Sequence, residues 1–228
     1  MKALYIGIFI FITHFSNAQM KIGLQAGYNH SKFTKTKFSP NPIYESYETS
    51  WFRGFNIGVV TEIAIANDLY LQPGILLQGK GTHLSFTSSF DTSSRFIELH
   101  YLELPLSLKF KTNWGNNMRA ITSLGLYGSK AIRGVEKGSG ISYSGPHSFY
   151  NKVEFSNKNE TQRLPTIIKP FDFGYSLLLG VEIKNFQLFT TFSQSFKGIT
   201  PNEKIYNGNF KNSTLSLSVT YFIIDAAK

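Results

Sequence analysis

The stretch that decides the fold is YLELPLSLKFK, Tyr101–Lys111, in which apolar and polar residues alternate. Every second residue from Leu102 to Phe110 is apolar, and the residues between them are Glu, Pro, Ser and Lys. A period of two places the two sets on opposite faces of a β-strand. The stretch therefore predicts a strand with one apolar face and one polar face.

The same alternation recurs along the chain of 228 residues, whose 21 Phe, 12 Tyr and 19 Gly fit strands and turns. The absence of cysteine excludes disulfide scaffolds, Cys-ligated metal centres and thiol catalysis. The expected strands span residues 20–29, 52–63, 69–80, 101–111, 118–129, 171–183, 186–196 and 214–223.

The connections between these strands alternate in length. Three are short, at 64–68, 112–117 and 184–185, and four are long, at 30–51, 81–96, 130–168 and 197–213. If consecutive strands run up and down, every short turn lies at one end and every long loop at the other, which is typical of transmembrane β-barrels. The sequence therefore predicts an all-β fold: an eight-stranded antiparallel up-and-down transmembrane β-barrel.

The first residues resemble a secretion signal. Lys2 precedes a short apolar run at 4–12, and Ser16-Asn17-Ala18 offers small residues for cleavage after Ala18. The run is much shorter than the ~20 apolar residues that a spanning helix needs. We expect a signal peptide at 1–18, one barrel domain at 19–228 and localisation in a bacterial outer membrane.

The orientation of the strands separates this reading from a soluble lipocalin-like carrier, which would put its apolar face inside. Strands of about ten residues match the ~9–11 that cross a bilayer. Glycine recurs on the polar face, at positions such as Gly27, Gly58 and Gly174. A narrow lumen needs small residues there, whereas on a water-facing surface they would only weaken the sheet. We expect the apolar face to meet lipid, with the soluble carrier as an alternative.

Ions of both signs lie on the polar face, where opposite charges can pair inside the barrel. Lys111 lies at the depth of several of them, near the short turns. The expected lumen charge network consists of Lys21, Glu62, Glu103, Lys109, Arg119 and Glu182.

Aromatic residues near the predicted strand ends fit the girdles found at membrane interfaces. Eight strands leave an interior that side chains can fill, so we expect no useful pore. The girdle candidates are Tyr28, Phe52, Phe110, Trp114, Phe171, Phe186 and Tyr221.

Four stretches resemble the PorT-like outer-membrane β-barrel domain family common in Bacteroidetes: YLELPLSLKFK at 101–111, FDFGYSLLLGVEIKNFQL at 171–188, LQPGILLQGKG at 71–81 and LSLSVTYF at 215–222. The resemblance covers essentially the whole mature chain. It implies an eight-stranded outer-membrane barrel, usually of undefined molecular role. One class of members takes part in gliding and type IX secretion, and no motif here singles out that role.

From the residues we expect a non-catalytic envelope protein, with a structural or interaction role, that acts through its long loops. The net charge of +9 concentrates in these loops, where it could attract lipid A phosphates or anionic glycans. We expect outer-membrane lipid and lipopolysaccharide as partners, with envelope or secretion-system proteins as further candidates, no nucleic acid, no cofactor and a monomeric barrel. The expected loop contacts are Arg133, Lys137, Tyr143, Phe149, Tyr150 and Lys152.

A lipid-modifying enzyme at the rim is the second possibility. No nucleophile-elbow pattern or ordered base–nucleophile pair can be read from the spacing. Rim residues that could converge are His30, His83, Ser85, Asp91, His100 and His147.

Overall fold

The computed structural model describes residues 19–35, 46–87, 91–115, 117–142, 144–158, 166–201 and 210–225. The predicted signal peptide at 1–18 therefore lies outside the described residues and stays a prediction. Among the residues described, no helix is long and apolar enough to cross a membrane.

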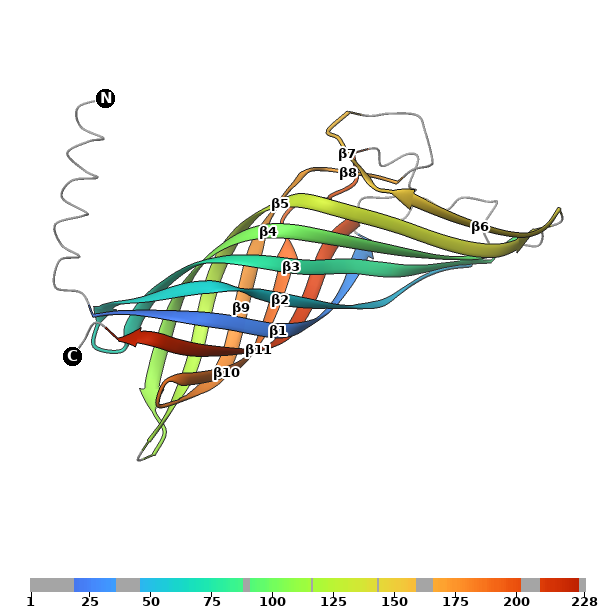
Figure 1. Ribbon diagram of the computed structural model, residues 1–228. Helices are drawn as coiled ribbons and strands as arrows, with labels where there is room; N and C mark the ends of the chain where they lie inside the picture. Colours follow the sequence, from blue (N-terminus) through green and yellow to red (C-terminus); the bar gives the residue numbers. More distant parts are fainter. Residues whose placement is uncertain are drawn as a thin grey trace, which may run out of the picture.

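Eight antiparallel strands close into a barrel, as predicted (Figure 1). Each strand pairs with its neighbour in the ring, and β1 pairs with both β2 and β11, which closes it. The strands of the ring are β1 (Met20–Lys35), β2 (Ser46–Ala66), β3 (Leu69–Thr87), β4 (Asp91–Asn113), β5 (Met118–Ser142), β9 (Phe171–Ile183), β10 (Phe186–Ser195) and β11 (Phe210–Asp225).

Three smaller strands lie between β5 and β9. β6 (Gly145–Lys152) folds back and pairs with β5, from Ser142↔Gly145 to Val135↔Lys152. β7 (Glu154–Phe155) and β8 (Ile167–Ile168) form a short parallel pair near the end of the barrel (Figure 1).

The prediction of long loops is wrong over much of their length, because the structure has strands there. β3 and β4 continue through most of 81–96, and β5 runs through 130–142 before β6 returns. Alternating hydrophobicity reports burial on one face only, so it fades where a strand leaves the membrane, although its backbone pairing continues. Likewise β1 extends to Lys35, and β2 begins at Ser46.

The barrel wall is therefore uneven in height. Strands β2 to β5 reach far beyond the ends of β9, β10 and β11, and β6 adds a further strand to the tall side (Figure 1). The tall part, here called the extension, consists of 46–51, 81–87, 91–100, 131–142 and β6. Short turns are periplasmic in transmembrane barrels, which places the extension on the extracellular side.

Candidate functional site: a closed barrel with an extracellular extension

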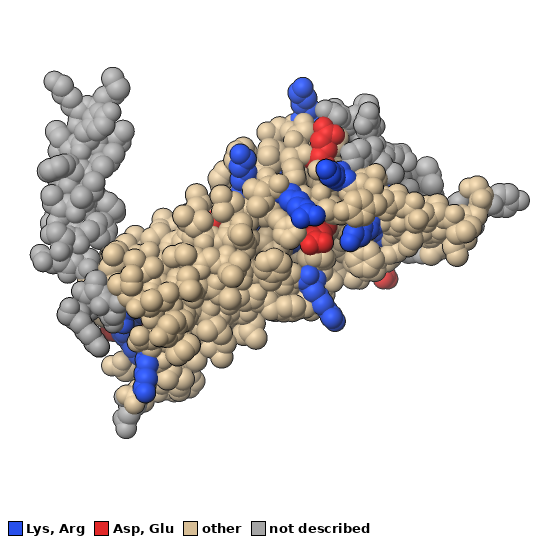
Figure 2. Space-filling model, in the orientation of Figure 1, with Lys and Arg blue, Asp and Glu red and all other residues tan. Residues whose placement is uncertain are grey.

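The outer surface of the barrel is apolar, as the sequence predicted. Leu104 and Leu106 are 56% and 49% exposed, whereas Glu103 and Lys109 on the other face are 5% and 0% exposed. On the face in Figure 2, the barrel wall between the short turns and the start of the extension carries few charged atoms, and the charges gather near the short turns and where the extension begins. Because the leucines point outward, the alternative of a soluble carrier with an apolar cavity is wrong.

Most of the expected girdle residues lie on this surface. Exposed aromatic rings near the short turns include Phe186 and Tyr221, whose centroids are 4.7 Å apart. Phe52 differs, because it is only half-exposed and its ring lies about where a side chain on Gly81 would go. The exposed members are Tyr28, Phe110, Trp114, Phe171, Phe186 and Tyr221.

A cluster of ions fills the periplasmic end of the lumen. Lys111 Nζ donates to Glu62 and, at 2.5 Å, to Glu182 Oε2. Gln187 Nε2 donates to the same two carboxylates, and its Oε1 accepts from Lys109 Nζ at 2.7 Å. All five side chains are buried. This layer of alternating charge and amide closes the barrel interior.

Two more predicted network residues lie at the edge of this layer. Arg119 Nη1 is 3.8 Å from Glu182 Oε1, and Nη2 is 3.3 Å from Asp68 Oδ1. Lys21 is half-buried and lies opposite Glu62 in the β1–β2 register. These cations therefore face the periplasmic end of the ion cluster.

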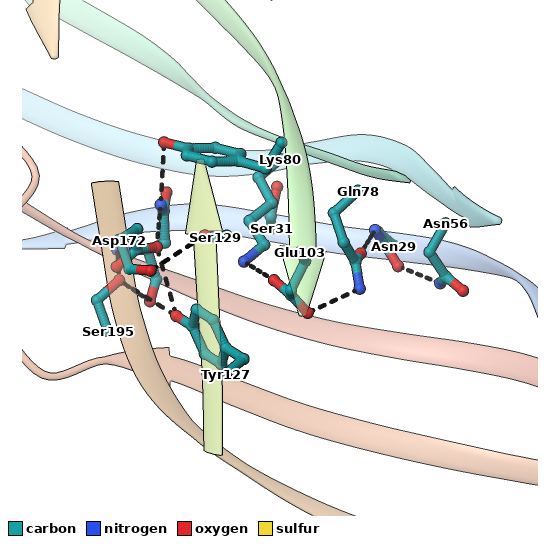
Figure 3. A network of polar contacts seen from close by, with 12 residues as sticks. Asn29, Ser31, Asn56, Gln78, Lys80, Glu103, Tyr127, Ser129, Asp172 and Ser195 are labelled. Carbon is teal, nitrogen blue, oxygen red and sulfur yellow. Dashed lines mark hydrogen bonds and ion pairs between the residues drawn. The ribbon is translucent and has the colours of Figure 1, made fainter. Parts of the chain in front are cut away.

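Glu103, the sixth predicted network residue, lies in a separate cluster. It accepts a hydrogen bond from Lys80 Nζ at 2.7 Å and one from Gln78 Nε2 at 3.1 Å. Amide side chains carry the network onward through Asn29 and Asn56 (Figure 3). The polar chain thus links β4, β3, β1 and β2 across the lumen.

Lys80 also lies between aromatic rings. Its Nζ is 4.3 Å from the ring centroid of Tyr127 and 5.4 Å from that of Tyr101. Asp172 sits beyond Tyr127 and accepts from Asn212 Nδ2 at 2.9 Å (Figure 3). Cation–π contacts and carboxylates together offset the cost of burying this ammonium group.

Lys80, Asp172 and Gln187 belong to the network in the structure but were not among its predicted members. Each lies on the polar face of its predicted strand, so the signal was present in the alternation. The partners of each side chain depend on its height along the barrel axis. That height is set by the stagger between neighbouring strands, which the sequence of one strand does not show.

A small cavity separates the two ionic clusters. It has a volume of about 50 Å³, enough for about four water molecules. Gln72 lines it, and Gln72 Nε2 has no hydrogen-bond partner among the described residues. A space of this size, lined by several amide and hydroxyl side chains, suits water.

An apolar plug closes the extracellular mouth. Segments from outside the ring fold into it: Ala131 N donates to Pro170 O, and Lys169 N donates to Ile199 O. The predicted lumen was filled by side chains with a charge network, and this apolar layer was not part of the prediction. The plug consists of Phe33, Leu84, Ile97, Leu99, Tyr101, Ala131, Val153, Ile168, Ile199 and Phe210.

The expected loop contacts lie on strands rather than in loops, which corrects that prediction. Arg133 and Lys137 belong to β5, and Phe149, Tyr150 and Lys152 belong to β6. Backbone pairing between β5 and β6 holds these side chains in a fixed register, with Lys137 opposite Tyr150. Tyr143 lies outside the described residues.

Phe149 faces the inner side of the extension instead of solvent. Its ring lies over Gly138, where a Cβ would approach it to 2.2 Å, and Arg95 stacks 5.4 Å from its centroid. Arg95 also pairs with the buried Glu136 at 3.0 Å, and Glu136 accepts from Thr166 N and Oγ1. These contacts fasten the returning chain to the inner side of the extension.

The rim residues considered for catalysis do not converge. His30 stacks on Trp51, and His100 pairs with Glu98 at 3.0 Å. His147 is exposed on β6, and the side chain of Asp91 lies outside the described residues. One base–hydroxyl pair does form: His83 Nε2 is 2.8 Å from Ser94 Oγ.

The fold, the lipid-facing belt and the filled lumen define a transmembrane β-barrel of the bacterial outer membrane. A family model described as "Outer membrane protein beta-barrel domain" matches residues 15–202, and the chain belongs to this family. No curated protein matches the chain.

Solved outer-membrane proteins resemble the chain at low identity. The attachment invasion locus protein Ail of Yersinia pestis is 15% identical, with a TM-score of 0.35 over 90% of this chain and 99% of Ail. OprG from Pseudomonas aeruginosa is 9% identical, with a TM-score of 0.40 over 90% of this chain and 93% of OprG.

Proposed function

We propose that this protein is a non-catalytic surface protein that acts by presenting its extension to other components of the cell envelope. The observation that carries the proposal is the contrast between the two parts of the molecule. The lumen is blocked by the ion cluster and the apolar plug, whereas exposed rings and cations such as Phe96, Lys137 and Tyr150 lie on the extension. An exposed apolar and charged surface on a rigid sheet is suited to recognition.

Site-specific photo-crosslinking in intact cells tests this role. A photoreactive phenylalanine at Tyr150 or Phe96 should form adducts with envelope components because both side chains are exposed on the extension. The same group at Leu106, in the lipid-facing belt, is the matched control and should form adducts with lipid only. Identical adducts from all three positions would contradict the proposal.

A lipid hydrolase at the rim is the second candidate, favoured by the contact between Ser94 and His83. A hydroxyl within hydrogen-bond reach of an imidazole is the minimal nucleophile–base pair. No carboxylate among the described residues hydrogen-bonds to His83, and its ring stacks on Phe96 with centroids 4.1 Å apart. The third group that orients the base in such catalysis is therefore missing from the part of the chain described.

Purified protein with labelled phospholipid separates the two candidates. The non-catalytic role predicts no turnover above a blank and no labelling of Ser94 by a fluorophosphonate. Turnover that is lost in Ser94→Ala and His83→Ala, but kept in Ser139→Ala on the neighbouring strand, would establish the hydrolase.

Within the outer-membrane barrel family, we propose a PorT-like member from Bacteroidetes. The Leu-Glu-Leu-Pro-Leu stretch at 102–106 and the Phe-Asp-Phe-Gly stretch at 171–174 support this placement. Cells lacking a PorT-like protein with the secretion-related role would lose type IX secretion, so a deletion strain with normal secretion would exclude that role for this chain.

A further inference from the structure

The outer side of the extension carries an ordered row of side chains from four adjacent strands. His83 lies opposite Phe96, Phe96 opposite Lys137, and Lys137 opposite Tyr150. The rings of His83 and Phe96 stack with an interplanar angle of 4°, and Lys137 Nζ is 5.7 Å from the Tyr150 ring centroid. Phe96 is 48% exposed and Tyr150 is 61% exposed, so the row is open to solvent.

A second row runs parallel to the first, two residues closer to the tip of the extension on each strand. It contains only serines: Ser85 opposite Ser94, Ser94 opposite Ser139, and Ser139 opposite Ser148. Side chains two apart on a strand share one face. We call the two rows together the platform.

The platform continues the lipid-facing surface of the barrel. Exposure alternates along β4 from Phe96 to Leu102, and Phe96 falls on the same face as Leu102, which belongs to the apolar belt. Phe96 lies six residues beyond Leu102. At about 3.3 Å per residue and a tilt near 40°, it stands roughly 15 Å above the belt. The interfacial zone of a bilayer is only about 5–8 Å deep on each side, so the platform lies above it.

The charge on this side is positive. Lys130, Arg133 and Lys137 are exposed along β5, with Lys130 opposite Leu102 at the top of the belt. Two acids are described on this face: Glu98 pairs with His100, and Glu48 on β2 lies opposite Ser85 at the far edge of the platform from β5. An anionic partner that extends from the membrane surface up to the platform would therefore meet cations along β5.

The chemistry of the platform fits a phosphorylated saccharide. Exposed aromatic rings can pack against the apolar C–H faces of sugar rings, because they offer an apolar surface with little entropy to lose. Serine hydroxyls both donate and accept hydrogen bonds, as sugar hydroxyls require. Lysine and arginine bind phosphate through charge-assisted hydrogen bonds.

We infer that the platform binds the phosphorylated core saccharide of the lipopolysaccharide molecules that surround the barrel. The inference rests on the proposed function and names its partner. The acyl chains of a lipopolysaccharide molecule would lie against Leu102, and its sugars would lie against Phe96 and Tyr150 higher on the same wall. The glycolipid would therefore run alongside the barrel from the membrane to the platform.

Binding of a soluble core saccharide tests the inference. The full-length protein in phospholipid nanodiscs is immobilised, and phosphorylated core oligosaccharide freed of its acyl chains is passed over it. Loss of one charge-assisted hydrogen bond at an exposed site should weaken binding about five- to tenfold, so we expect at least this loss for Lys137→Ala together with Tyr150→Ala. Dephosphorylated core should bind wild-type protein comparably weakly.

The matched control is Lys184→Asn together with Trp114→Ala. It removes one cation and one exposed aromatic ring at the periplasmic turns, and asparagine tolerates the left-handed backbone of Lys184, whose φ is 54°. This control should bind like wild type. Heat-modifiable gel mobility checks that every variant forms a barrel.

Three results would overturn the inference: equal binding by wild type and the platform variant, an equal loss in the control, or no binding of the core while lipid A alone is retained. The last result would assign the cations to the lipid headgroup. None of these results would affect the crosslinking from Tyr150 and Phe96. The proposed surface role is therefore tested independently of the saccharide inference.

Discussion

Lys80 and Glu103 form an ion pair of 2.7 Å inside the barrel, with side chains only 1% and 7% exposed. Lys80 lies on β3 and Glu103 on the adjacent β4, and both point into the lumen, where Glu103 lines the small cavity. At these buried positions water cannot solvate a charge whose partner has been removed. The main effect of the pair on stability is therefore the large free-energy cost of removing one of its two members.

Glu103→Gln should destabilise the barrel by about 3–5 kcal/mol, because it leaves the Lys80 ammonium group buried without its carboxylate. Replacing both partners, as in Lys80→Met with Glu103→Leu, should cost much less, since the buried ammonium group is removed together with its carboxylate. Urea unfolding in detergent, followed by heat-modifiable gel mobility, gives both values. A double variant as unstable as the single one would show that the pairing is not the cause.

Leu106→Arg should cost about 2–4 kcal/mol in lipid vesicles, because a lipid-facing cation near the bilayer midplane is poorly solvated. Leu106 is exposed on the outer face and lies opposite Leu126 on β5. Ile141→Arg is the matched control, since Ile141 is 69% exposed but lies on the extension, outside the hydrocarbon. Equal costs at the two positions would place the membrane belt elsewhere.

Gly174→Ala should destabilise the protein by about 1–3 kcal/mol through overpacking. A Cβ there would lie 2.1 Å from the backbone oxygen of Gln194 and 2.5 Å from the Tyr127 hydroxyl, which binds Asp172. Gly128→Ala is the control, because its nearest neighbour is the outward ring of Phe173 at 3.1 Å. Thermal melts in detergent should rank Gly174→Ala well below Gly128→Ala; the reverse order would contradict the packing argument.

The wild-type protein should show no discrete conductance steps in planar bilayers, because the lumen is blocked twice. Replacing Lys109 and Lys111 by alanine should not open a channel, since the apolar plug around Leu99 and Ile168 remains intact. Steps of conductance in the wild type would refute the closed lumen. Steps in the lysine variant alone would show that the plug does not seal.

Much of the barrel could be predicted from local pattern. The alternation in Tyr101–Lys111 identified both the strand and its lipid-facing side, and Leu104 and Leu106 do point outward. The periplasmic charges were also recognised as a set, and Glu62, Lys109 and Glu182 lie together with Lys111. Such inferences succeed because a strand between lipid and lumen must alternate.

The extension was missed for the converse reason. Above the membrane neither face of a strand meets lipid, so outward positions such as Ser94, Ser139 and Ser148 need not be apolar. The sequence around them therefore resembles a loop. Backbone pairing, not side-chain pattern, continues these strands. The register that places Phe96 beside Lys137 therefore came only from the structure.

The sequence by itself determined where the strands lie, which face of each strand meets lipid and which end of the barrel bears the long connections. It could do so because the bilayer imposes the same alternation on every strand separately. Only the tertiary structure decided which ions pair, where the mouth is sealed and which side chains lie in rows across the extension. These depend on strand stagger and on chain segments that meet across the barrel, and no single strand contains that information.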